Sequence, residues 1–298
     1  MDLVEQTGRR RAASAAVVTV ALWASAFVFI RLAGQDFSPG ALALGRLASG
    51  SVVLVVLLLI VGDGFPPRPA WRGIGISGLL WFGVYMVALN WGERYLDAGT
   101  AALVINLGPV LIAVLGGLVL REGFPARLMV GIAVSFTGAV VVGLADSEGS
   151  ATLLGVVLCV IAAASWAIAV VVQKPALVHA SALQVTTGGC VVGTLACLPF
   201  AGQLFDELGS APLTATLSLI YLGVFPTAIA FTTWAYALAR MTAGQVGATT
   251  YAVPALVIVM AWFVLGELPR PVALLGGVLC LAGVALTRSG RKPSAPAK

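Results

Sequence analysis

Charged residues are scarce in this chain: they fill 10% of its 298 positions, whereas soluble domains carry about 25%. Hydrophobic residues fill 60%, and the mean hydropathy is +1.03. No soluble core could take up so much apolar surface, and no stretch is polar enough to form a second, soluble domain. The composition therefore predicts an all-α, polytopic membrane protein whose residues lie in the bilayer or in short turns.

Other scarcities exclude particular kinds of site. Lysine occurs only three times and no G-x(4)-G-K-[ST] motif is present, so neither a nucleotide site nor an ATPase subunit is indicated. The single histidine, His179, follows Lys174-Pro175 in a loop, and all four cysteines lie in apolar runs, where they act as small hydrophobes. We therefore expect no cofactor and no metal site. The net charge of +5 is explained by membrane orientation, so no nucleic-acid partner is expected.

Carboxylates are absent from the middle of every apolar run. Glu93, Asp97, Glu122 and Glu267 all lie at the ends of runs, beside turns. Proton-driven exporters of cationic drugs need a carboxylate within the membrane. The sequence therefore argues against that mechanism and favours facilitated movement down a gradient.

Breaks at charged residues, prolines and glycines divide the chain into ten apolar spans. Each is about long enough to cross a bilayer as a helix; they cover residues 13–33, 39–62, 73–92, 98–120, 127–145, 151–173, 181–201, 213–238, 243–266 and 271–287. Loops on the side of the termini carry thirteen Lys and Arg, and the opposite loops carry three. By the positive-inside rule, residues 1–12 and 289–298 are cytoplasmic tails of an inner-membrane protein surrounded by lipid.

The chain contains an internal duplication. Residues 98–143 align without a gap on residues 243–288, and ten of the 46 positions are identical. The matches include one proline, one glutamate and three glycines, which chance pairing of apolar segments does not explain; they are Gly99/Gly244, Pro109/Pro254, Glu122/Glu267, Gly131/Gly276 and Gly138/Gly283. Because half of ten spans is an odd number, the repeats 13–145 and 146–288 must enter the membrane from opposite sides. The sequence thus predicts two inverted five-helix repeats.

Several motifs resemble the drug/metabolite transporter superfamily. They are Trp23-x-Ser25-x-Phe27, Ser38-Pro39 followed by Arg46, and the paired P-x-L…E stretches that begin at Pro109 and Pro254. The chain is most similar to its EamA-type ten-helix exporters, and among these to YddG-type exporters of aromatic amino acids. That resemblance implies export of small amphipathic metabolites. The second repeat departs from the pattern at one position: Gly189 occupies the place that corresponds to Arg46 of the first repeat.

Arg46 is the only charge deep inside a span. It lies seven residues after Pro39, or about 10 Å along a helix. One interpretation is a structural arginine that snorkels or binds carbonyl groups. The other is a cavity-facing group that pairs with a substrate carboxylate.

Aromatic and amide side chains supply a candidate substrate site. Its expected members are Trp23, Trp81, Tyr85, Asn106, Trp166 and Tyr251, which combine apolar surface with a few hydrogen-bonding groups. Each aromatic residue alone is equally consistent with helix packing. The combination predicts a site for amphipathic or aromatic substrates.

Pro109 and Pro254 lie at matching depths of the duplicated spans and are candidate hinges. Each should remove a helical hydrogen bond and bend its helix. Paired broken helices near the midplane are typical of the substrate sites of repeat-built transporters. A fixed kink that only shapes the cavity is the alternative.

The sequence therefore predicts a secondary exporter, of amino acids including aromatic ones, that works by alternating access. A membrane-embedded enzyme acting on lipid-like substrates is one alternative, but the spans hold no usable grouping of nucleophile and base. Export of other metabolites or drugs is another. A passive channel would instead need polar rings along a pore.

Overall fold

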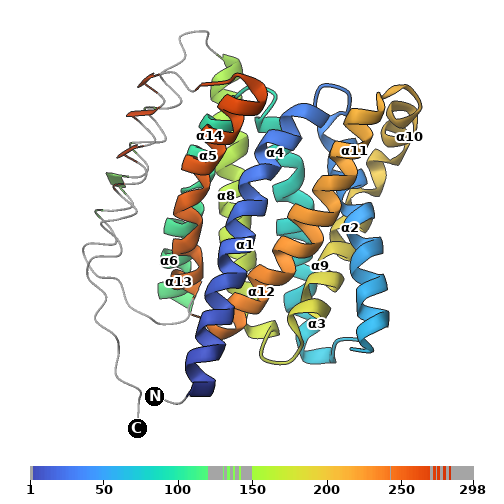
Figure 1. Cartoon of the computed structure of the whole chain (residues 1–298), viewed down its shortest axis with the longest axis vertical. Coiled ribbons are helices and arrows are strands. Elements are labelled where there is room, and N and C mark those ends of the chain that lie inside the picture. Colours follow the sequence, from blue (N-terminus) through green and yellow to red (C-terminus); the bar gives the residue numbers. More distant parts are fainter. Residues whose placement is uncertain are drawn as a thin grey trace.

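The computed structural model describes residues 3–119, 150–241 and 243–268, with isolated positions at 130, 133, 134, 137, 141, 271, 272, 274, 275, 278, 279 and 282. Throughout these residues the chain forms helices and turns, without a strand. The helices stand roughly side by side as an upright bundle (Figure 1). Most of the expected spans 127–145 and 271–287 lie outside the described residues, as do Glu122, Gly131, Gly138, Gly276 and Gly283.

The described helices follow the expected spans in order. The first part of the chain forms α1 (Leu3–Ala33), α2 (Pro39–Val61), α3 (Arg68–Ser77), η1 (Gly78–Tyr85), α4 (Met86–Gly92), α5 (Ala98–Ile105) and α6 (Gly108–Val119). The second part forms α8 (Ser150–Ala176), α9 (Ala182–Cys197), η2 (Leu198–Phe200), α10 (Ala201–Ser210), α11 (Leu213–Leu222), η3 (Gly223–Ile229), α12 (Ala230–Arg240), α13 (Ala243–Thr249), η4 (Thr250–Ala252) and α14 (Val253–Leu265).

Seven stretches within the described residues are long and apolar enough to cross a membrane. They correspond to the first four expected spans and to the sixth, seventh and eighth. The seventh is longer than expected, because the helical course continues through η2 and α10 to Ser210. The ninth expected span is interrupted, and its apolar helical part covers Thr250–Leu265.

The two proline-containing spans are broken rather than bent. The first stops at Ile105, turns at Asn106 and Leu107, and restarts at Gly108, so Pro109 is the second residue of α6. The other passes through η4, and Pro254 lies in the first turn of α14. A proline in the first turn of a helix sacrifices no hydrogen bond, since that N–H has no partner there. Each proline therefore marks the start of a new helix.

The interruptions divide the two spans into four shorter helices, α5, α6, α13 and α14, which pack crosswise in pairs. The α5 helix packs against α14 in the upper half of Figure 1, and α6 packs against α13 below. Asp97 caps α5, because its carboxylate accepts a hydrogen bond from the Thr100 N–H at 2.8 Å. The interruptions of both spans therefore lie between the upper pair, α5 and α14, and the lower pair, α6 and α13 (Figure 1).

Two π-helical segments interrupt the third and eighth spans. They are η1 and η3, and their first residues, Gly78 and Gly223, are 145 residues apart, which is also the offset between Pro109 and Pro254. Single-turn π segments inside α-helices occur often at functional sites. Here η1 carries Trp81 and Tyr85, and η3 carries Thr227.

Candidate functional site

A cavity lies in the middle of the bundle, between the two π-helical segments and the helix interruptions beside Pro109 and Pro254. Its volume is about 40 Å³, enough for a few water-sized molecules. Its lining includes Trp23, Trp81, Tyr85, Asn106 and Trp166 from the predicted set, together with Arg46 and Pro254. The further lining residues are Ala26, Phe27, Leu89, Ala102, Ile105, Phe231, Thr250 and Val253.

Two of the predicted residues lie elsewhere. Tyr251 is in η4 and is not among the lining residues, whereas its neighbour Thr250 is. Pro109 does not line the cavity either; it faces Gly247 of α13, where an added β-carbon would lie 3.9 Å from the proline. Both prolines thus lie in the first turn of a helix, but only Pro254 lines the cavity.

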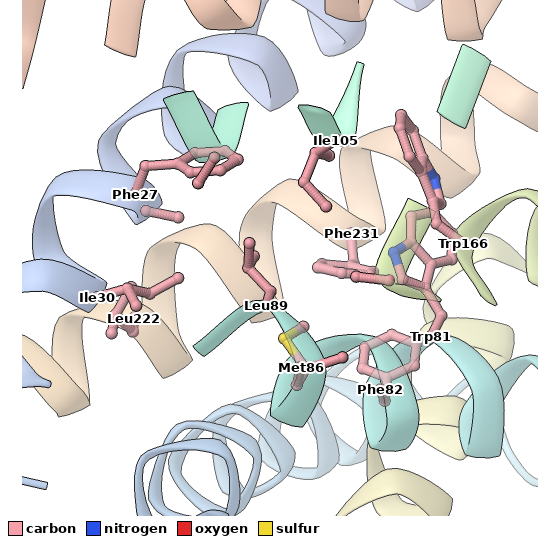
Figure 2. Close-up of a cluster of buried hydrophobic side chains, with 14 of the residues drawn as sticks. Phe27, Ile30, Trp81, Phe82, Met86, Leu89, Ile105, Trp166, Leu222 and Phe231 are labelled. Atoms are coloured by element: carbon pink, nitrogen blue, oxygen red, sulfur yellow. The ribbon is translucent and has the colours of Figure 1, made fainter. Parts of the chain in front are cut away.

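An aromatic cluster forms one side of the cavity. Trp23 contacts Trp81, Trp166 and Trp234, with ring centroids 5.8, 6.0 and 4.9 Å apart. Figure 2 shows Trp81, Trp166 and Phe231 gathered from three different elements, and the Trp81 and Phe231 rings are 4.7 Å apart. Edge-to-face and offset contacts at these separations stabilise aromatic pairs by about 0.5–1.5 kcal/mol each.

The position of Trp166 depends on a glycine at the α5–α6 break. A β-carbon at Gly108 would lie 2.2 Å from Cε3 of the Trp166 indole, well inside any normal contact. Only glycine lets this backbone approach the ring so closely. The interruption between α5 and α6 thus also places the backbone of Gly108 against Trp166 of the aromatic cluster.

Arg46 is buried, with 2% of its surface exposed, and it faces the cavity rather than the lipid. Its Nε donates a hydrogen bond to the Thr227 hydroxyl at 2.7 Å. That hydroxyl in turn donates to the Leu222 carbonyl at 2.9 Å. Pro226 lacks the N–H that would bind this carbonyl in a regular α-helix. The hydroxyl of Thr227 binds the carbonyl instead, and this bond orients Thr227 and, through it, Arg46.

The cavity carries hydrogen-bond donors that have no partner. Four buried nitrogens of lining residues bind no acceptor in the described part of the chain: Trp23 Nε1, Arg46 Nη1, Asn106 Nδ2 and Trp166 Nε1. All four are donors, and the lining contains no carboxylate. An unpaired buried polar group costs about 1–3 kcal/mol. The cavity is therefore suited to a group that accepts several hydrogen bonds, above all an anion.

The helices α1, α4 and α14 all end at the upper end of the bundle (Figure 1). Toward this end lie Phe27, Ile30 and Leu89 (Figure 2), each at most 4% exposed, and we call these three residues the apolar layer. Beyond this layer, Arg31 Nη2 lies 2.6 Å from the Glu267 carboxylate, and Arg31 Nη1 donates to the Glu93 carbonyl at 2.8 Å. We call the Arg31–Glu267 pair the latch.

Sequence reasoning missed three contributors to the site. Phe231 and Trp234 lie three residues apart, a spacing that places them on one helix face and could have identified them. Thr227 follows Pro226, and a proline inside an apolar run is a signal for a local irregularity with a free carbonyl. Its pairing with Arg46 joins residues 181 positions apart and is visible only in the structure.

Comparison with known proteins is consistent with this architecture. A model of the EamA-like transporter family matches the chain twice, over residues 10–144 and 153–289. A probable terminal-alkyne amino-acid exporter of Streptantibioticus cattleyicolor is 36% identical over 93% of this chain and 93% of its own length. The uncharacterized transporter YdfC of Bacillus subtilis is 31% identical over 90% and 88%, respectively.

Two further similarities are more distant. A probable amino-acid metabolite efflux pump of Salmonella typhimurium is 26% identical over 90% of this chain and 92% of its own length. One solved crystal structure has a similar fold, with a TM-score of 0.65 and 22% identity, over 94% of this chain and 98% of the other. The double family match spans nearly the whole chain, and the described helices are of membrane-spanning length. The chain therefore belongs to the EamA-like transporter family, as a multi-pass membrane transporter of small molecules and not an enzyme.

Proposed function

We propose that this chain is a secondary exporter of amino acids, including aromatic ones. The substrate binds in the central cavity and crosses by alternating access between two inverted five-helix repeats, residues 13–145 and 146–288. The thirteen basic residues on the side of the termini, against three opposite, support cytoplasmic termini in the inner membrane. The lower end of Figure 1 is then cytoplasmic, and the latch faces the periplasm.

The observation that carries the proposal is the set of unpartnered donors inside an aromatic cavity. A substrate carboxylate can accept from Arg46 Nη1 and Asn106 Nδ2, since its two oxygens offer about four acceptor positions. The tryptophan faces can stack on an aromatic side chain or attract an ammonium group. Two relatives named for amino-acid export support the same substrate class.

Alternating access is supported by the small size of the cavity. Binding sites for small molecules commonly have volumes of about 300–1,000 Å³, and this cavity holds about 40 Å³. A substrate must therefore widen the cavity, which requires the surrounding helices to move. The equal spacing of the prolines and of the π-helical segments supports two repeats that move against each other.

Counterflow in liposomes tests the function. Purified full-length protein is reconstituted, the liposomes are loaded with unlabelled L-phenylalanine, and uptake of labelled L-phenylalanine is measured. A carrier accelerates this uptake, whereas a channel does not respond to the unlabelled substrate. Loading with phenylalaninol, which has no carboxylate, should give little acceleration if Arg46 and Asn106 bind that group.

Two variants locate the binding site. Arg46→Gln should reduce counterflow at least tenfold, whereas Arg240→Gln, which changes an arginine at the end of α12, should leave it unchanged. Absence of counterflow for every amino acid in a panel would contradict the proposed function. Equal activity of Arg46→Gln and wild type would contradict the proposed site.

A further inference from the structure

A second pocket lies beyond the central cavity, at the upper end of the bundle. Its volume is about 220 Å³, and it is lined by Ile30, Arg31, Gly34, Gln35, Asn90, Glu93 and Arg94. Along α4, Leu89 lines the cavity and the next residue, Asn90, lines this pocket. The pocket is therefore a neighbour of the cavity, on the side of the apolar layer.

Glu93 is the unusual residue of this pocket. Only 2% of its surface is exposed, and neither carboxylate oxygen has a hydrogen-bond partner in the described part of the chain. An ionised carboxylate buried without partners is so unfavourable that the group takes up a proton instead. Burial accordingly raises the pKa of the Glu93 carboxyl well above its ordinary value.

Glu93 lies next to the latch. Arg31 Nη1 already donates to the backbone carbonyl of Glu93 at 2.8 Å, while Nε and Nη2 of Arg31 donate to Glu267 at 3.0 and 2.6 Å. Glu267 also accepts from the Ala98 N–H at 3.4 Å, at the start of α5. The latch thus joins the ends of α1, α5 and α14, and a second carboxylate stands beside its arginine.

We infer that Glu93 is a proton-binding residue of the carrier and that its proton controls the latch. With a proton on Glu93, Arg31 has one carboxylate partner, Glu267, and the upper end is closed. When the proton leaves to water, the Glu93 carboxylate competes for the Arg31 guanidinium, and α14 is released. The inference rests on the proposed carrier function and adds an ion that the sequence did not indicate.

The charged and titratable groups that act on Glu93 come from several elements. Arg31 and Arg46 favour its ionised form, whereas Glu267 and Asp97 oppose it. Tyr85 and Cys159 also lie close enough to interact with it, and Arg94 lines the same pocket. Burial has a larger effect than any of these groups.

The sign of the pH effect follows from the raised pKa. The closed form binds the proton more tightly than an open form in which Glu93 meets water or Arg31. Acid therefore favours the closed latch, and this preference is lost as the pH rises from the pKa of the open form through that of the closed form. Each unit of difference between these two pKa values changes the closed-to-open ratio by at most about tenfold.

Distance measurements between spin labels test the inference without a substrate. Gln35→Cys and Leu268→Cys place labels at exposed positions beyond the ends of α1 and α14, in a full-length chain whose four native cysteines are replaced by alanine. In this labelled chain without further substitutions, double electron–electron resonance should give one short distance at pH 5 and an added longer distance at pH 9. A distribution that does not change with pH would overturn the inference.

Three variants identify the titrating group. Glu93→Gln, which stays neutral, should keep the short distance at both pH values. Asp36→Asn is the matched control, because Asp36 is an exposed carboxylate at the same end, and it should respond to pH as wild type does. Glu267→Ala removes the partner of Arg31 and should show the longer distance already at pH 5. A wild-type pH response in Glu93→Gln, or a closed Glu267→Ala, would overturn the inference.

Transport of labelled L-phenylalanine separates this inference from the proposed function. Across a pH gradient, wild type should concentrate the label by up to about tenfold per pH unit if one proton is exchanged per substrate. Glu93→Gln, whose latch stays closed, should lose both this accumulation and counterflow, whereas the control Asp36→Asn should keep both. Failure of wild-type counterflow would contradict the carrier function, whereas counterflow without any response to the gradient would contradict the proton site.

Discussion

Two glycines of α6 differ in what surrounds them, and this makes them a matched pair. A β-carbon at Gly108 would meet the Trp166 indole at 2.2 Å, whereas one at Gly116 would have nothing within 4 Å. Gly108→Ala should therefore displace Trp166, lower the stability by about 1–3 kcal/mol and reduce counterflow. Gly116→Ala should keep or slightly raise the stability, because alanine favours the helix.

Thermal unfolding in detergent, followed by tryptophan fluorescence, measures both glycine variants. Equal melting temperatures for Gly108→Ala and Gly116→Ala would show that Trp166 is not held by this contact.

A second matched pair tests the orientation of Arg46. Thr227→Val removes the hydroxyl that accepts from Arg46 and donates to Leu222, and it leaves the buried Arg46 Nε without this partner. We expect a loss of about 1–3 kcal/mol in stability and weaker substrate binding. Thr232→Val is the control, since among the residues that the structure describes the Thr232 hydroxyl binds the Ala228 carbonyl of its own helix turn and no other group.

The readout for the threonine pair is the substrate concentration that gives half-maximal counterflow. If Thr227→Val and Thr232→Val raise it equally, Thr227 does not orient Arg46.

The sequence predicted which residues line the site where their side chains are of a kind that is rare inside a membrane span. Arg46, Trp23, Trp81 and Trp166 stood out for this reason, and the structure brings them to one cavity. Glu93 did not, because it lies at the end of its run, where carboxylates are usually solvated. Its burial depends on the ends of α1 and α14, which are distant in sequence.

At the scale of the elements, the interruptions of the helices are what shape the central cavity, because many of its lining residues lie in or beside them. The breaks at Pro109 and Pro254 were signalled by proline, although the sequence predicted bends rather than two separate helices. The η1 segment contains no proline, and its close contact with α9 through Gly78 is a tertiary feature. Sequence periodicity alone could not identify it, because π and α segments of the same composition look alike.

The two breaks lead to a prediction about motion. Pro109→Ala or Pro254→Ala supplies an N–H that can bind the carbonyl four residues earlier and so join the two half-helices into one. If the breaks act as hinges, each variant should slow counterflow severalfold while leaving the affinity for L-phenylalanine nearly unchanged. Wild-type rates in both variants would indicate fixed kinks that only shape the cavity.

At the scale of the whole molecule, the duplication relates features that are far apart in the chain. Pro109 and Pro254, and the first residues of η1 and η3, share the same offset of 145 residues. The halves nevertheless differ where the substrate is proposed to bind, since Arg46 has Thr227 as its partner and no counterpart arginine in the second half. The proposed site is thus asymmetric although the sequence is duplicated, and this asymmetry suits a substrate with one carboxylate.

The orientation of the protein in the membrane gives the last prediction. Arg68, Lys174 and Arg240 lie at the helix ends that gather at the lower end of Figure 1, and Lys174 binds the Met241 carbonyl there at 2.9 Å. Arg31 and Arg94 lie at the upper end, but the charge of Arg31 is balanced by Glu267. Cysteines placed at Glu5 or Ala295 should therefore resist an impermeant thiol reagent added to intact cells, whereas Gln35→Cys should react. The reverse pattern would place the latch in the cytoplasm, and the proton that closes it would then come from inside the cell.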